Sequence, residues 1–140
     1  MIRSALKRLS TNDVGATKSH QAGFLIPKSL VRGGLFDPLT EKTLNPRSQL
    51  KFRDTASDLL FYPNFIYYNN KYFGGTRFEY RLTGLTKWIR ESGLQEGDSI
   101  QISRTGVFAY DITTIKKVRR PRVLTEESWV ALYGNGEVHA

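Results

Sequence analysis

The sequence predicts a mainly β domain, closed or nearly closed into an antiparallel barrel with two short helices. The chain has 140 residues and is 39% hydrophobic, enough for one core of ordinary size. Its apolar stretches are short, rich in β-branched and aromatic residues, and separated by Gly, Asn, Asp and Pro. Many short strands of this kind favour a barrel. We expect strands at 5–10, 22–26, 49–53, 64–70, 78–82, 99–104 and 107–112.

Two short helices are expected between these strands. A proline ends the second strand and opens a helix over 28–32, and the pair of glycines that follows it stops the helix. Thr86 is placed to cap a second helix over 87–92, in which Trp88 and Ile89 face the core. The prediction is therefore a set of strand pairs with two short helices.

The charge of the chain points to an anionic partner. It holds 21 Lys and Arg against 13 Asp and Glu, a net charge of +8. The first 53 residues carry ten basic and three acidic side chains, so most of the excess lies there. Nucleic acid is the expected partner. No basic amphipathic helix favours a membrane surface. The alternative is an excess of lysine that only keeps the protein soluble.

The charge pattern also predicts a domain boundary. Residues 116–122 include five basic side chains, whereas 123–140 contain three acidic and no Lys or Arg side chains. We expect one domain over 1–122, and a tail or linker over 123–140 that leads towards another domain. The sequence has no cysteine, no apolar run of about 20 residues and no signal-peptide core, so a cytoplasmic protein is expected.

Equipment for catalysis is not found in the sequence. The chain has two histidines and no cysteine, no phosphate-binding loop of the GxxxxGK[ST] type, and no acidic residue two positions before any lysine. The last pattern is common in magnesium-dependent nucleases. The prediction is therefore a non-catalytic domain with no metal and no cofactor.

One polar stretch, at 7–21, offers a mixture of hydrogen-bond donors and acceptors. Such a mixture suits the major groove of DNA, where each base pair presents its own pattern of donors and acceptors. The alternative is an ordinary surface loop with an Asn-Asp turn. The candidate DNA-binding residues of this stretch are Lys7, Arg8, Asn12, Asp13, Lys18, Ser19 and His20.

A second stretch, at 69–81, contains an alternating row of charges. Arg77, Glu79 and Arg81 would point to one face of a strand, and a row of three charges does not belong in a core. Arginine reads guanine through two parallel hydrogen bonds, and glutamate accepts from the cytosine amino group. The alternative is a solvated strand face with ion pairs.

Nine of the 17 aromatic residues lie within 61–80, next to this row. They lie on predicted strands at alternating positions, which favours packing in the barrel core. The alternative is a surface on which single-stranded bases stack.

Two strings of this sequence resemble a known family. LKRLSTNDVGAT at 6–17 is followed by His20-Gln21 and Ile26-Pro27, and IYYN at 66–69 is followed by Phe73-Gly74, Thr76-Arg77, Glu79 and Arg81. Both resemble the amino-terminal DNA-binding effector domain of EcoRII-like restriction endonucleases. The unit from Trp88 to LQEGD at 94–98 is also similar to the DNA-binding pseudobarrels of plant transcription factors.

The resemblance implies a seven-stranded open pseudobarrel whose two arms enter the major groove of double-stranded DNA. The first arm is 7–21 and the second arm is 71–81. It implies a CCWGG-type target, where W is A or T, a monomer on DNA, and a separate nuclease domain fused to this one in the full-length protein.

The resemblance also suggests roles for single residues. Arg77 and Arg81 would read guanines, and Glu79 and His20 would assist at neighbouring base edges. Phosphate contacts are expected from Lys7, Arg8, Lys18 and Lys71, and Gly75, Thr76 and Tyr80 complete the second arm. This chain departs from the family at Gly75 and Tyr80, where the family has lysines, and at Leu25, where it has a tyrosine.

Three other functions remain open at this stage. They are a barrel that stacks single-stranded nucleic acid on its aromatic residues, a protein-interaction barrel with an acidic partner, and a complete nuclease.

Overall fold

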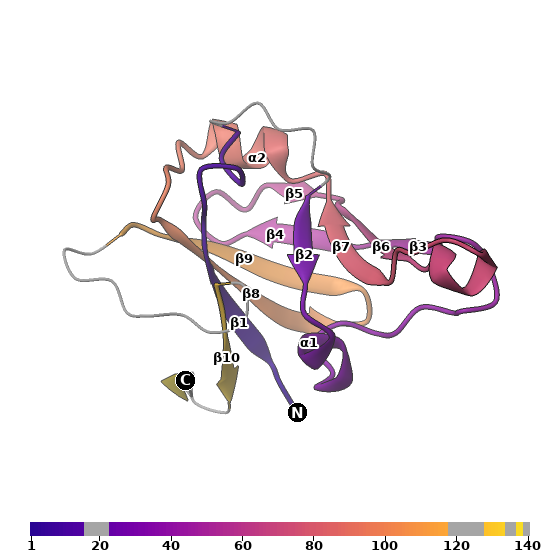
Figure 1. Cartoon of the computed structure of the whole chain (residues 1–140). Coiled ribbons are helices and arrows are strands. Elements are labelled where there is room, and N and C mark those ends of the chain that lie inside the picture. Colours follow the sequence, from indigo (N-terminus) through magenta and orange to yellow (C-terminus); the bar gives the residue numbers. More distant parts are fainter. Residues whose placement is uncertain (16–22, 118–127, 134–136, 139–140) are drawn as a thin grey trace.

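Two β-sheets form the framework of the protein (Figure 1). The computed structural model describes residues 1–15, 23–117, 128–133 and 137–138. Sheet A has the strand order β11-β10-β1-β8-β9-β4-β5, and sheet B has the order β2-β7-β6-β3. The strands of sheet A are β1 (Ser4–Arg8), β4 (Lys51–Asp54), β5 (Leu60–Phe61), β8 (Ser99–Gly106), β9 (Ala109–Ile115), β10 (Trp129–Tyr133) and β11 (Glu137–Val138). Those of sheet B are β2 (Phe24–Ile26), β3 (Arg47–Gln49), β6 (Asn64–Tyr68) and β7 (Glu79–Thr83).

The predicted mainly β class is confirmed, and two details differ. The strand expected at 49–53 is divided at Leu50, which is buried between β3 in sheet B and β4 in sheet A. The chain passes here from one sheet to the other, as strands do at the corners of packed sheets. In addition, β4 pairs with β9 in parallel, from Lys51↔Ala109 to Asp54↔Ile112, so the fold is not wholly antiparallel.

Aromatic rings fill the space between the sheets. Phe36 stacks on Phe65 of sheet B and on Tyr110 of sheet A, with centroids 4.9 Å and 5.2 Å apart. Tyr80 stacks on Phe65 and on Tyr67, at 5.1 Å and 4.2 Å. The expectation of core packing is therefore confirmed for Phe65, Tyr67 and Tyr80. It is wrong for Tyr62, Tyr72 and Phe73, which are exposed.

Both predicted helices are present. Helix α1 spans Lys28–Arg32, as expected, and α2 spans Thr86–Glu91. Thr86 is not the cap of α2, because Leu85 occupies that position and no side chain caps the helix. Trp88 and Ile89 are buried as expected. The indole Nε1 of Trp88 donates to Asp54 Oδ2 at 2.9 Å, which fixes α2 against β4.

The segment predicted as a tail contributes a strand to sheet A. Strand β10 pairs antiparallel with β1, from Ser4↔Leu132 to Lys7↔Trp129, and Trp129 is only 2% exposed. The acidic composition of 123–140 concealed the short run WVALY, whose aromatic and β-branched residues suit a strand. Within the described residues, no helix is long and apolar enough to cross a membrane.

Candidate nucleic-acid interface

The second arm is a tight loop, closed by hydrogen bonds between its two ends. The 3-10 helix η1 (Asn70–Phe73) opens it, and Asn70 Oδ1 accepts a hydrogen bond from the Arg77 amide at 2.6 Å. The amide of Lys71 donates to the Arg77 carbonyl at 3.0 Å. A side chain at Gly75 would put Cβ 2.5 Å from Asn70 Oδ1, so only glycine fits without a shift. Lys71, Gly75 and Thr76 are exposed on this loop.

Strand β7 carries the charged row on the face opposite the core. Tyr80 and Leu82 belong to the core, and Glu79 and Arg81 alternate with them. Glu79 Oε1 accepts from Arg77 Nε at 3.1 Å and from Arg77 Nη2 at 2.9 Å. Glu79 Oε2 lies 3.3 Å from Arg81 Nη2. Two arginines thus share one carboxylate, and the row retains a net positive charge.

The two arginines differ in exposure. The Arg77 side chain is 43% exposed and its guanidinium carbon lies 3.9 Å from the centroid of the Tyr68 ring. The Arg81 side chain is 8% exposed, and its Nη1 donates to the Gly23 carbonyl at 3.4 Å. Arg77 precedes β7 and joins the row through Glu79. The expected row is present, but its inner arginine is buried.

The base of the first arm is held by a buried ion pair. Lys7 Nζ lies 2.9 Å from Asp13 Oδ2, and both side chains are less than a tenth exposed. The same ammonium lies 5.3 Å from the Phe24 ring centroid and 6.0 Å from that of Trp129. Asp13 Oδ2 also accepts from the Ser10 amide at 2.9 Å. The structure therefore gives Lys7 and Asp13 a structural place, in contrast to the phosphate contact expected of Lys7.

The base of the first arm, at residues 7–13, lies beside Arg81 of the charged row. A pocket of about 280 Å³ lies between them. It is lined by Lys7, Ser10, Asn12, Asp13, Gly23, Leu25 and Arg81. Strand β2 joins the two parts, because Leu25 pairs with Arg81 of β7. Gly23 has φ +64°, and a Cβ there would lie 1.9 Å from the Leu82 carbonyl oxygen. This glycine permits the backbone just before β2 to lie close against β7.

The remaining predicted residues fall into three groups. Tyr80 is only 7% exposed, because its ring is stacked in the core, and burial raises the pKa of its phenol. Arg8 and Asn12 are partly exposed at the base of the first arm. Lys18, Ser19 and His20 lie outside the described residues.

Sequence reasoning missed the residue that anchors the second arm. Asn69 is fully buried, and its Oδ1 accepts from the Asn45 amide at 2.8 Å. Its Nδ2 donates to the Thr43 carbonyl at 2.9 Å. These bonds tie the second arm to the loop before β3. In the sequence the only signal is the pair Asn69-Asn70, which reads equally well as a surface turn.

Comparison with known proteins assigns the chain to a family. The family model described as "Restriction endonuclease EcoRII, N-terminal" matches residues 2–110. The chain belongs to the EcoRII N-terminal family. The expected family is thereby confirmed, and the match includes both arms and the whole of sheet B.

Relatives of the EcoRII N-terminal family member described here include the type II restriction enzyme EcoRII of Escherichia coli. The two are 40% identical over 89 residues, which make up 60% of this chain and 20% of that enzyme. The chain thus spans about a fifth of the length of this curated relative.

Two solved structures share the fold. One is the Arabidopsis FUS3–DNA complex, with a TM-score of 0.58, 20% identity, and coverage of 81% of this chain and 96% of that one. The other is the N-terminal domain of Helicobacter pylori LlaJI.R1, with a TM-score of 0.58, 11% identity, and coverage of 96% and 100%. They confirm the expected pseudobarrel fold.

Proposed function

We propose that this domain recognises a specific sequence in double-stranded DNA, with its two arms in the major groove and a CCWGG-type site as its target. The observation that carries the proposal is the Arg77–Glu79–Arg81 row beside the polar base of the first arm. Membership of the EcoRII N-terminal family supports it, as does the likeness in fold to FUS3, whose structure is a complex with DNA.

Glu79 prepares the arginines for base recognition. Two of the five N–H donors of Arg77 are directed at this carboxylate, and among the described residues the others meet no acceptor. The carboxylate and the Tyr68 ring fix the plane of the Arg77 guanidinium before DNA arrives. A fixed plane lowers the entropy cost of a bidentate contact with guanine O6 and N7. Arg77 is thus the outer reader of the row.

Arg81 forms part of the wall of the pocket between the arms, so its burial does not separate it from the interface. Asn12 of the first arm and Arg81 of β7 both line this pocket, so a ligand that enters it can contact both. Removing water from such a site strengthens polar contacts. Arg8, at the base of the first arm, and Lys71, on the second arm, would contact phosphates and set the register of the protein on the duplex.

The domain itself would not cleave DNA. We propose that it binds DNA as a monomer and that a nuclease domain follows it in the full-length protein, as the relation to a type II restriction enzyme suggests.

The test is a comparison of two duplexes, one with the intact site and one with the site scrambled. Replacing Arg77 with Ala should weaken binding to the intact site by about 1–3 kcal/mol. The same substitution should weaken binding to the scrambled duplex much less. Arg90→Ala, at an exposed position of α2, is the matched control and should bind both duplexes normally. Equal losses on both duplexes would show that Arg77 does not read a base.

The exposed Tyr72 and Phe73 are the residues on which a single strand could stack. Most of the large rings are in the core, so the duplex is favoured. Competition between duplex and single-stranded oligonucleotides separates the two functions, and preference for the single strand would overturn the proposal.

A further inference from the structure

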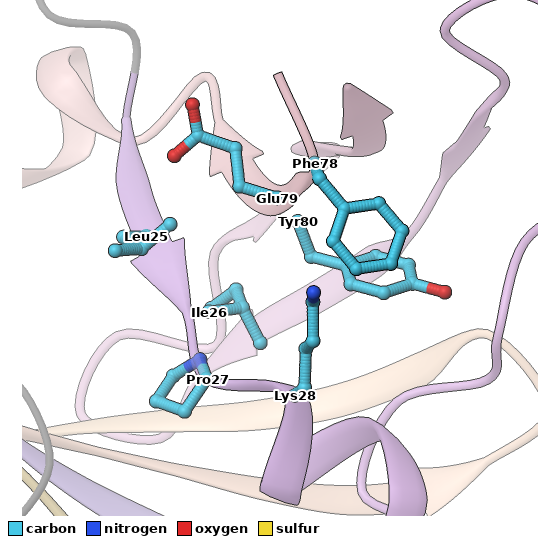
Figure 2. A pocket seen from close by; sticks show the side chains of 7 residues that line it. All are labelled: Leu25, Ile26, Pro27, Lys28, Phe78, Glu79 and Tyr80. Carbon is cyan, nitrogen blue, oxygen red and sulfur yellow. The ribbon is translucent and has the colours of Figure 1, made fainter. Parts of the chain in front are cut away.

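A second pocket lies on the other side of Glu79, next to the start of α1 (Figure 2). Its volume is about 370 Å³. It is lined by Leu25, Ile26, Pro27, Lys28, Phe78, Glu79 and Tyr80. Figure 2 shows the Lys28 ammonium directed at the Phe78 ring, whereas the Glu79 carboxylate points away from it. Lys28 Nζ is 3.2 Å from the centroid of that ring.

A second ammonium approaches the same ring. Lys71 Nζ, from the second arm, lies 5.0 Å from the Phe78 centroid. Among the described residues neither lysine pairs with a carboxylate. Burial, followed by the charges of Lys71 and Arg32, lowers the pKa of Lys28. Positive charge is thus concentrated here, and the face of the Phe78 ring offsets part of it.

The position of this charge fits the duplex. Lys28 lines the same pocket as Glu79, and Lys71 approaches the Phe78 ring of that pocket, so both ammonium groups lie near the row that we propose to face the bases. In protein–DNA interfaces, cations beside the base-reading residues contact the sugar-phosphate backbone, and those contacts fix the register. The ring of Phe78 also holds two long side chains that would otherwise lose much freedom on binding.

We infer that Lys28 and Lys71, whose ammonium groups both lie over the Phe78 ring, form a binding site for one backbone phosphate of the DNA. This inference rests on the proposed function and adds Lys28, from a different part of the chain, to the interface. The phosphate oxygen would accept from both ammonium groups and neutralise the charge that this pocket concentrates. The contact is independent of base sequence.

The experiment uses the whole chain and four proteins: wild type, Lys28→Met, Lys28→Arg and Lys51→Met. Methionine keeps an apolar side chain against the Phe78 ring and removes the charge, whereas arginine keeps the charge. Lys51 is exposed on β4 of sheet A and is the matched control. Binding to the intact and scrambled duplexes is measured from about 50 to about 200 mM salt, and thermal unfolding checks that each variant is folded.

Lys28→Met is expected to weaken binding to both duplexes by the same factor, roughly threefold to tenfold, and to reduce the slope of log K against log salt by about one unit. Lys28→Arg and Lys51→Met should match wild type. A duplex series with single neutral methylphosphonates should contain one position at which wild type loses affinity and Lys28→Met does not.

Three results of the duplex measurements would overturn the inference. They are an unchanged salt slope in Lys28→Met, a loss confined to the intact site, and the absence of any methylphosphonate position that distinguishes wild type from Lys28→Met. Strong competition by inorganic phosphate at constant ionic strength would instead identify a site for free phosphate and overturn it as well. A wild-type protein with no preference for the intact site would contradict the proposed function, while a uniform Lys28 effect would leave the phosphate site standing.

Discussion

Ion pairs on the two sheets differ in the ratio of cations to carboxylates. In sheet A, Arg53 binds Asp111 at 3.0 Å, and Asp58 supplies it with a second carboxylate. Arg104 binds Asp37 at 2.8 Å and also donates to the Gly34 carbonyl at 2.9 Å. Each of these arginines has at least one carboxylate of its own. Such balanced ion pairs are expected where the pair serves only to support the fold.

In sheet B the ratio is reversed. Arg77 and Arg81 share Glu79, and Lys28 and Lys71 nearby have no carboxylate partner among the described residues. Gathering like charges destabilises a fold unless an anion joins them. The comparison teaches that the excess charge of the chain is not spread evenly: beside sheet B, where we propose that DNA binds, four cations accompany the single carboxylate of Glu79.

The largest effect is expected at Gly23, the glycine just before β2 that lies against β7 of sheet B. Gly23→Ala would create a contact of 1.9 Å with the Leu82 carbonyl oxygen at a position with φ +64°. We expect the free energy of unfolding to fall by about 3 kcal/mol, measured by urea denaturation. Gly15→Ala is the control, because Gly15 also has positive φ but no atom within 4 Å, and should cost only about 1 kcal/mol. Equal costs would mean that the close approach to β7 is unimportant.

A reciprocal pair of substitutions tests the two sheets directly. Arg81→Met should reduce discrimination between intact and scrambled duplexes by about 1–3 kcal/mol. Its effect on stability should be smaller, because an apolar side chain of similar volume replaces a buried cation. Arg104→Met should reduce stability by about 1–2 kcal/mol, because Asp37 and the Gly34 carbonyl lose their donor. Its DNA discrimination should be unchanged. The opposite assignment of the two effects would refute the division between the sheets.

The smallest effect concerns acid. Burial raises the pKa of Asp98, but hydrogen bonds from the amides of Gln95 and Lys117, with the charge of Lys116, bring that pKa below its ordinary value. Its contribution to stability is therefore complete above the ordinary carboxyl pKa of about 4, and is lost as the pH falls through the lowered value. Asp98→Asn should reduce the loss of stability between about pH 5 and pH 2, measured by thermal unfolding. An identical pH profile would exclude this role.

Local patterns in the sequence predicted local structure well. Alternation placed Glu79 and Arg81 on one face of β7, and the proline and glycine signals gave the bounds of α1. These features depend on neighbours along the chain, so a single sequence contains them. The stacked rings of Phe65 and Tyr67 were anticipated for the same reason.

Features set by distant partners could not be predicted. Lys7 was expected on the surface, but Asp13 and the Trp129 ring enclose its ammonium, and no pattern within 7–21 announces Trp129. Tyr80 was expected among the DNA-binding residues, yet it lies on the core-facing side of β7. The charge row was identified as a group, whereas the burial of Arg81 follows from the pairing of β2 with β7.

Strand β10 gives the first arm a support from far along the chain. The indole of Trp129 covers the Lys7 ammonium, and the Ser128 carbonyl accepts from the Arg8 amide at 3.0 Å. A protein shortened after β9 would keep Arg77, Glu79 and Arg81. It would lose the contacts that Ser128 and Trp129 make with the base of the first arm. Under the proposed function, the sequence selectivity of the protein would therefore also depend on Ser128 and Trp129, through the base of the first arm.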